Sequence, residues 1–174
     1  AGLSQIVLAR EMHDSQRSRG DILQEMLRNW QVMQESIERG IQSTERSLSG
    51  MTGGDAKKLY AYREQGYMGE AAVSAAAYAV GISEVNAVMG RIVACPTAGS
   101  CGIVPAALYA AKKQRHLADA DIVLALLTAA GIGMVIDQNA SIAGAAGGCQ
   151  AECGTAAGMA AAALVELADG TPAM

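Results

Sequence analysis

The chain has 174 residues, a length that suits one domain with its own hydrophobic core. Apolar residues make up 51% of it, yet aromatic residues only 3%, against 35 alanines and 20 glycines. Alanine favours helices and is depleted in strands, so this composition argues against all-β folds. The high apolar fraction argues against disorder. The balance of 17 acidic against 13 basic residues offers no basic surface for nucleic acid.

The first 70 residues hold 19 of the 30 charged side chains and 4 alanines, and they predict an outer layer of amphipathic helices. Apolar residues recur at three- and four-residue steps, most clearly around Trp30. We expect Asp21 to cap the longest helix of this part, Gly40 to lie near its end, and Asp55 to cap the next helix. The helices are expected over residues 3–13, 21–39 and 56–63, with a loop over 47–55.

Residues 71–174 alternate alanine-rich helices with glycine-rich loops and predict the interior of the molecule. Runs of Val, Ile and Thr long enough for strands are absent from the sequence. The longest apolar run, residues 122–136, is short for a membrane span and contains two glycines, so we predict a buried core helix. Helices are expected over residues 69–80, 83–90, 104–113, 119–136 and 156–168. We predict an all-α fold of closely packed alanine-rich helices, forming a single domain over residues 1–174.

Four cysteines, Cys95, Cys101, Cys149 and Cys153, form two pairs in the sequence. No secretory leader is recognisable, which predicts a cytoplasmic protein with reduced thiols or metal ligands. The spacing matches neither common zinc ribbons nor ferredoxin motifs, so it is weak evidence for a single four-cysteine metal site.

Two loops carry most of the chemical signal. Residues 95–102 place Thr97, Gly99 and Ser100 directly before a helix, where backbone N–H groups and the helix dipole favour an anion such as a carboxylate. An ordinary turn explains the same composition. Residues 139–154 are predicted as a glycine-rich loop with polar side chains and two thiols, either a site or a packed loop with two buried cysteines. Both histidines, His13 and His116, are expected at the solvated surface.

Longer motifs resemble a known family, the iron–sulfur-dependent L-serine dehydratases. The Met51–Asp55 loop and the helix around Trp30 resemble the α chain of the two-subunit form. The similarity covers essentially the whole chain. The other matching segments are residues 83–106, 139–152, 159–166 and 170–172.

The resemblance implies an L-serine ammonia-lyase that forms pyruvate and ammonia with a [4Fe–4S] cluster acting as a Lewis acid on the serine hydroxyl. It implies an all-helical catalytic domain, a β chain or β domain as partner, a homo- or hetero-oligomer, and no nucleic-acid or membrane partner. It also implies one cluster ligand, Cys149, from the Gly-Cys-Gln motif. The implied substrate-binding residues are Thr97, Gly99, Ser100, Cys101, Asn139 and Ser141.

The sequence departs from the family pattern in ways that bear on activity. The two further cysteine motifs of the family are missing, and its Ser-Ser-His-Thr loop, a natural place for an acid or base, is missing too. Ala98 replaces a frequent asparagine, and Cys95 and Cys153 receive no role. We therefore expect a C-terminally truncated chain that alone holds no stable cluster and has no activity. The alternative is a non-catalytic helical binding module that kept the fold and lost the chemistry.

Overall fold

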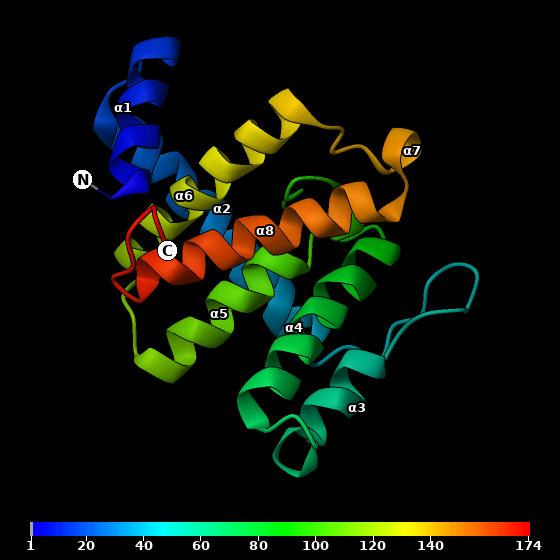
Figure 1. Cartoon of the computed structure of the whole chain (residues 1–174). Helices are drawn as coiled ribbons and strands as arrows, with labels where there is room; N and C mark the ends of the chain where they lie inside the picture. The colour runs from blue at the N-terminus through cyan, green and yellow to red at the C-terminus, as the bar shows by residue number, and fades with distance from the viewer. Residues whose placement is uncertain (1) are drawn as a thin grey trace.

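The computed structural model describes residues 2–174, which contain helices and no β-strand, so the all-α prediction is confirmed. Figure 1 shows the helices in chain order. The helices are α1 (Leu3–Ser15), α2 (Arg19–Gly40), α3 (Asp55–Ala61), α4 (Glu70–Ala87), α5 (Ile103–Arg115), α6 (Asp119–Asn139), α7 (Gly144–Gly147) and α8 (Cys149–Leu167), with 3-10 turns η1 (Arg63–Gln65) and η2 (Ala98–Ser100).

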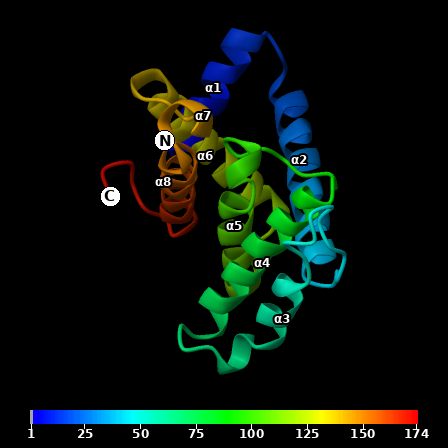
Figure 2. The same cartoon turned by 90° about the vertical axis from the view of Figure 1, so that its right-hand side faces the viewer.

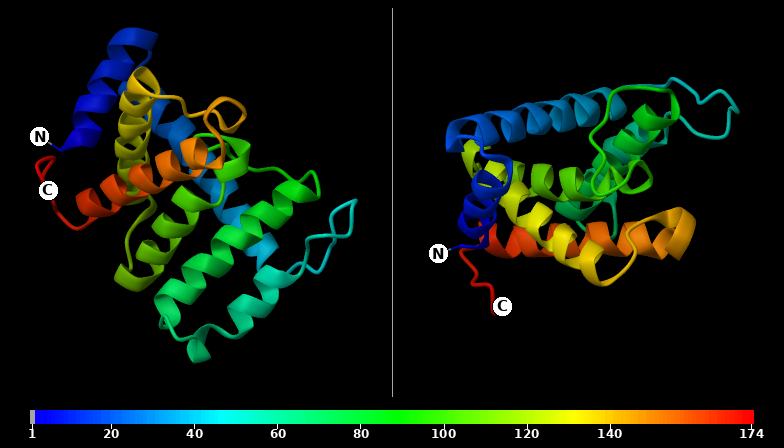
Figure 3. Two further views of the ribbon diagram at one scale, coloured as in Figure 1. Left: turned by 45° about the vertical axis from the view of Figure 1, so that its right-hand side comes forward. Right: turned by 90° about the horizontal axis from the view of Figure 1, so that it is seen from above.

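The helices pack around α5 and α6. Helices α2 and α8 lie on opposite sides of α5, as the side and top views show (Figure 2, Figure 3). Helix α8 packs along α6 and α5, while α4 packs against α2, α3 and α5. The start of α1 lies beside the end of α8, where Glu166 accepts hydrogen bonds from the backbone N–H of Ser4 (3.3 Å) and from the hydroxyl of Thr128.

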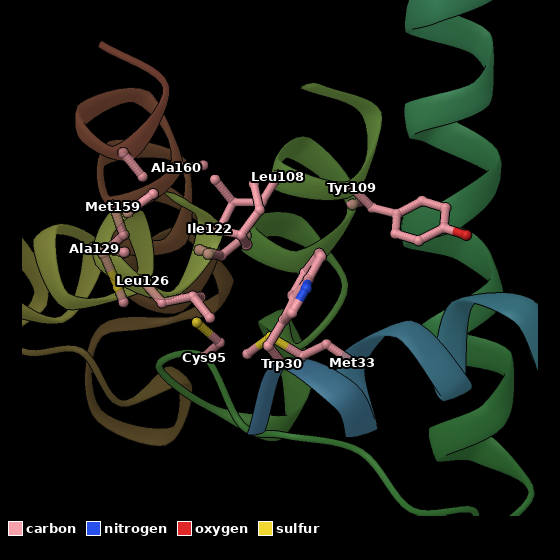
Figure 4. Close-up of a cluster of buried hydrophobic side chains, with 14 of the residues drawn as sticks. Trp30, Met33, Cys95, Leu108, Tyr109, Ile122, Leu126, Ala129, Met159 and Ala160 are labelled. Carbon is pink, nitrogen blue, oxygen red and sulfur yellow. The ribbon is translucent and has the colours of Figure 1, made fainter. Parts of the chain in front are cut away.

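Three of the six aromatic side chains lie together in the main core. Trp30 of α2 lies 6.2 Å from the Tyr109 ring of α5, which meets Tyr78 of α4 edge to face at 5.0 Å. Figure 4 shows Trp30 beside aliphatic side chains of the core, whereas the Tyr109 ring points toward α4. The Trp30 indole N–H donates to Asp119 at 2.8 Å, which satisfies the polar atom of a fully buried ring. Large rings thus join α2, α4 and α5 at one point, and aliphatic side chains and alanines fill the rest of the core.

Helix α4 is continuous, so the prediction of two helices over 69–80 and 83–90 is wrong. Gly81 lies in the middle of α4, where it faces Gly40 at the end of α2. A Cβ atom added to Gly40 would lie 2.4 Å from the Gly81 backbone, closer than real Cβ contacts allow. Glycine at position 81 therefore permits a close crossing of two helices and does not end one.

The helix starts also differ from expectation. Ser18, and not Asp21, caps α2, because its hydroxyl accepts from the Asp21 N–H at 3.2 Å. Gly54, and not Asp55, precedes α3 as its cap residue. Gly40 is the last residue of α2, and residues 47–54 are irregular, as predicted.

The predicted loop over residues 139–154 is wrong for most of its length. Helix α6 continues through Asn139, α7 forms one turn, and α8 begins at Cys149, seven residues before the predicted start at residue 156. Cys149 and Cys153 are therefore one turn apart on a helix. The connector between α6 and α8 lies above the start of α8 in Figure 1.

Helix α6 is long and apolar enough to cross a membrane by length and composition. In this fold it packs between α1, α2 and α8, and nine of its residues are buried. The prediction that residues 122–136 form a buried core helix is confirmed up to Gly133, whereas Met134 and Val135 are exposed.

Candidate functional site

The loop over residues 95–102 is held in shape by its own hydroxyl groups. The Ser100 hydroxyl lies 3.2 Å from the Thr97 hydroxyl, donates to the Cys95 carbonyl at 3.2 Å, and accepts from the Thr97 N–H at 3.4 Å. Ser100 and Cys101 are buried, with 2% and 1% of their surface exposed, whereas Gly99 is exposed. Ser100 thus orders the loop from inside.

Two other helices fix the outside of this loop. The Thr97 hydroxyl donates to Oε2 of Glu152 on α8, and the Asn86 side chain on α4 donates to the Ala98 carbonyl at 3.4 Å. At the end of the loop, Gly102 lies directly on α4, since an added Cβ atom would be 2.4 Å from the carbonyl oxygen of Ala79. The loop is therefore anchored on α4 and α8 before it enters α5.

The structure brings only part of the predicted site residues together. Thr97, Gly99, Ser100 and Cys101 share the loop over residues 95–102, and Thr97 and Gly99 reach α8 through Glu152. Asn139 is exposed and donates to the Val135 carbonyl of its own helix at 2.7 Å. Ser141 is exposed and accepts from the Ala143 N–H at 3.3 Å. Asn139 thus lies at the end of α6 and Ser141 on the connector that follows, and each is bonded locally.

The four thiols form two separate environments. Cys95 packs in the main core beside Trp30, Met33 and Leu126 (Figure 4), and burial raises the pKa of its thiol to about 12. Burial also raises the pKa of Cys101.

Cys149 and Cys153 lie at the surface of α8 with their Sγ atoms 3.6 Å apart. The contact with Cys149 holds the pKa of Cys153 above its ordinary value. The exposed pair is the chemically accessible one.

A groove of about 300 Å³ lies where the loop before α3 meets the loop before α5. The backbone N–H groups of Gly54 and Asp55 donate to the buried Glu84 carboxylate at 3.1 and 2.8 Å, which fixes the first loop on α4. The groove is lined by Thr52, Asp55, Ala79, Val80, Ser83, Glu84, Ala87, Gly99, Ser100, Gly102 and Ile103. Two loops singled out in the sequence thus meet around one small hollow.

Sequence reasoning missed Glu84 and Glu152 as organising residues. Both carboxylates bind groups at least 29 positions away in the chain, so no local pattern reveals them. One sequence feature could have indicated Glu152: it stands three residues after Cys149, and in a helix this spacing places both side chains on the same face. The prediction of a loop over residues 139–154 removes this indication, because the spacing has no such meaning in a loop.

The thiols of this chain fit an iron–sulfur cluster only in part. Cys149 is exposed at a helix start and suits one thiolate ligand, with Cys153 beside it. Within residues 2–174, however, no three His, Cys, Asp or Glu side chains gather as a metal site requires. The ligand set is incomplete in the part of the chain that the structure describes.

Comparisons with known proteins agree with the motifs. The family model described as serine dehydratase alpha chain matches residues 1–174. The chain is 46% identical to a probable L-serine dehydratase alpha chain of Bacillus subtilis, covering 98% of this chain and 57% of that protein. It is 43% identical to the L-serine dehydratase alpha chain of Peptoniphilus asaccharolyticus, covering 95% and 58%. An L-serine dehydratase of Escherichia coli is 40% identical over 90% of this chain and 36% of its own length.

The chain thus spans less than three fifths of the length of these relatives. The family match extends over both loops that form the groove and over the start of α8 with its two thiols. From this match and these identities, the chain belongs to the serine dehydratase alpha chain family.

Proposed function

We propose that the chain is part of an L-serine dehydratase that converts L-serine to pyruvate and ammonia. The observation that carries the proposal is the groove between the loops before α3 and α5, in a chain of this family. Its volume is at the small end of ligand sites, which are roughly 300–1,000 Å³. The relatives' names support serine as the substrate, and the words alpha chain in two of them support a β chain as the partner. We also propose that the protein works as a homo- or hetero-oligomer.

Charge in the groove fits a zwitterionic amino acid. The first turn of α5 faces the groove at Gly102 and Ile103, and its free N–H groups favour the substrate carboxylate. The Asp55 carboxylate lines the same groove and is suited to the α-ammonium group. Asp55 already accepts from Lys58 at 3.0 Å on the exposed side, which keeps its carboxylate in place.

The substrate-binding set that we propose keeps the residues found in the sequence and divides their roles. Gly99 lines the groove, and Thr97 lies beside it against α8. The buried residues Ser100 and Cys101 maintain the shape of the loop. Asn139 and Ser141 do not line the groove, and we keep them in the proposed set only on the resemblance to the family.

The proposed reaction needs no redox change. A base removes the α-proton, the β-hydroxyl leaves as water, and the enamine tautomerises to an imine that water hydrolyses to pyruvate and ammonia. The residues of this chain hold the two charged ends of serine, so that the α-proton and the hydroxyl are presented in a fixed orientation. A [4Fe–4S] cluster, to which Cys149 contributes one thiolate, supplies a Lewis acid for the hydroxyl when bound.

Activity of the whole protein with its partner chain tests the substrate assignment. We expect the whole protein to form pyruvate from L-serine. In an Asp55→Asn variant, KM for L-serine should rise about tenfold, because roughly one charge-assisted contact is lost. Asp14→Asn on the exposed face of α1 is the matched control and should leave KM unchanged. No pyruvate from the anaerobically prepared whole protein would favour the non-catalytic binding module.

Cluster content tests the ligand assignment. After anaerobic reconstitution we expect the 174-residue chain alone to hold no stable cluster and to be inactive, because three thiolates are not gathered in it. In the whole protein, Cys149→Ala should abolish iron and sulfide binding, and Cys153→Ala should retain it. About four irons per isolated chain, or equal loss in both variants, would contradict the assignment.

We also propose the cytoplasm as the compartment. The support is chemical: all four thiols are free in the structure, including the exposed pair on α8, and exposed thiols persist in reducing compartments. Treatment of intact cells with a membrane-permeant thiol reagent before lysis tests it, since reduced Cys149 and Cys153 should be labelled.

A further inference from the structure

Glu152 lies where three segments of the candidate site meet. Its Oε2 accepts from the Thr97 hydroxyl of the loop over residues 95–102. Its own helix begins three residues earlier at Cys149. The third segment is the connector before α8, where a Cβ atom added to Gly144 would lie 2.6 Å from Oε1 of the same carboxylate. Glu152 is partly buried, and it connects these segments although they are separated by up to 55 positions in the chain.

Two glycines provide the space for this carboxylate. A Cβ atom added to Gly99 would lie 2.6 Å from Oε1 of Glu152, and one added to Gly144 would also lie 2.6 Å from it. Neither glycine has a positive φ, so the requirement there comes from contact with the carboxylate and not from backbone conformation. Gly99 also lines the groove, which brings Glu152 to its edge.

We propose that Glu152 is a positioning residue of this site. Its carboxylate holds Thr97 and Gly99 against the start of α8, and so fixes the groove-lining loop relative to the helix turn that carries Cys149. This inference rests on the proposed function for its catalytic consequence, whereas the anchoring of the loop is testable without it. Glu152 acts through Thr97 and Gly99 and itself touches no reacting atom.

The test uses the whole protein with its partner chain and two kinds of measurement. Amide hydrogen exchange reports the order of residues 95–102, and steady-state kinetics with iron assays report the site. The variants are Glu152→Ala, Glu152→Gln, Thr97→Val and the double variant of Glu152→Ala with Thr97→Val. Glu35→Gln, at an exposed position of α2, is the control.

Removal of the carboxylate should free the loop. In Glu152→Ala we expect amides of residues 95–102 to exchange at least about tenfold faster, because one hydrogen bond to a charged group is lost. Thr97→Val should do the same, and the double variant should add little, because both changes break one interaction. Glu152→Gln keeps an acceptor for the Thr97 hydroxyl and should restore most of the protection.

The kinetic readout separates positioning from simple support of the fold. We expect Glu152→Ala to raise KM for L-serine more than it lowers kcat, with bound iron and the thermal midpoint close to those of the control. Loop exchange equal to that of Glu35→Gln, or effects of Glu152 and Thr97 that add independently, would overturn the proposal. If the protein turns over no serine, the function fails while the exchange result still decides the anchoring.

Discussion

The hydrogen bonds between the Glu84 carboxylate and the start of α3 give a direct test of what stabilises the fold at the groove. Its side chain is 6% exposed, and its two oxygens accept from the N–H groups of Gly54 and Asp55 at 3.1 and 2.8 Å. These N–H groups belong to the start of α3, where the helix dipole favours a negative charge. We expect Glu84→Gln, a change that preserves shape, to lower the free energy of unfolding by about 3 kcal/mol.

The magnitude follows from the two bonds. A hydrogen bond to a charged group contributes about 1.5–3 kcal/mol, and a neutral one about 1 kcal/mol. Glutamine keeps one carbonyl oxygen, so one bond becomes neutral, while its NH₂ group faces the second N–H and that bond is lost. With a typical urea m-value of about 2 kcal/mol per molar, the unfolding midpoint should fall by roughly 1.5 M.

Glu70→Gln is the matched control on the same helix. Glu70 lies in the first turn of α4, its side chain is 63% exposed, and its ion pair with Arg63 is 3.5 Å long. Exposed ion pairs contribute roughly 0–1 kcal/mol, so its midpoint should move by less than about 0.5 M. Equal midpoints for Glu84→Gln and Glu70→Gln, or unchanged hydrogen exchange at Gly54 and Asp55, would refute the reasoning.

Further outcomes follow from packing, charge and thiol burial. Gly81→Ala should destabilise by about 1–3 kcal/mol because its Cβ atom would press on α2, whereas Gly158→Ala, with the nearest atom at 3.7 Å, should stabilise by about 0.5–1 kcal/mol in thermal unfolding. Burial tends to raise the pKa of Asp119, but hydrogen bonds from the tryptophan indole and a lysine outweigh it and lower that pKa. Because the pKa is lowered in the folded state, ionised Asp119 stabilises the fold at pH values above the unfolded pKa near 3.8, and this stabilisation is lost as pH falls through the folded pKa. Asp119→Asn should therefore lower the free energy of unfolding at neutral pH and change it little near pH 3. Tryptophan fluorescence during unfolding measures both. Iodoacetamide at about pH 8 should modify Cys149 in the native protein and leave Cys95 unmodified, since only a thiolate reacts and the Cys95 pKa is about 12; rapid labelling of Cys95 would contradict its burial.

The fold class and most helices follow from sequence because alanine content and apolar spacing are local properties. The errors fall at glycines and polar residues whose roles are tertiary. Gly81 is typical of a helix end by propensity, yet here it lies against Gly40 inside a continuous helix. Likewise, the glycines and polar residues of 139–154 are typical of a loop, but α8 begins inside that stretch at Cys149.

In the candidate site, too, local features follow from the sequence and tertiary contacts do not. The composition of residues 95–102 predicts the loop, and its polar residues lie together because they are adjacent in the chain. The separation of the thiols could not be read from spacing, since Cys95 points into the core while Cys149 lies on the surface. The joining of this loop to α8 depends on Glu152, whose partner Thr97 is 55 positions away.

Three glutamates account for how a core of small residues holds its outer segments in place. Alanine and glycine let helices approach closely, but their small side chains make few contacts that could fix a neighbouring loop. Glu84 binds the start of α3, Glu152 binds the loop before α5, and Glu166 joins α1 and α6 to the end of α8 through Ser4 and Thr128. Within residues 2–174, the hydrogen bonds to these carboxylates come from backbone N–H and hydroxyl groups, so these links should resist high salt better than exposed ion pairs do. Glu84 lines the groove, and Glu152 accepts from the loop whose Gly99 also lines it, so both links should keep the groove in shape as ionic strength rises.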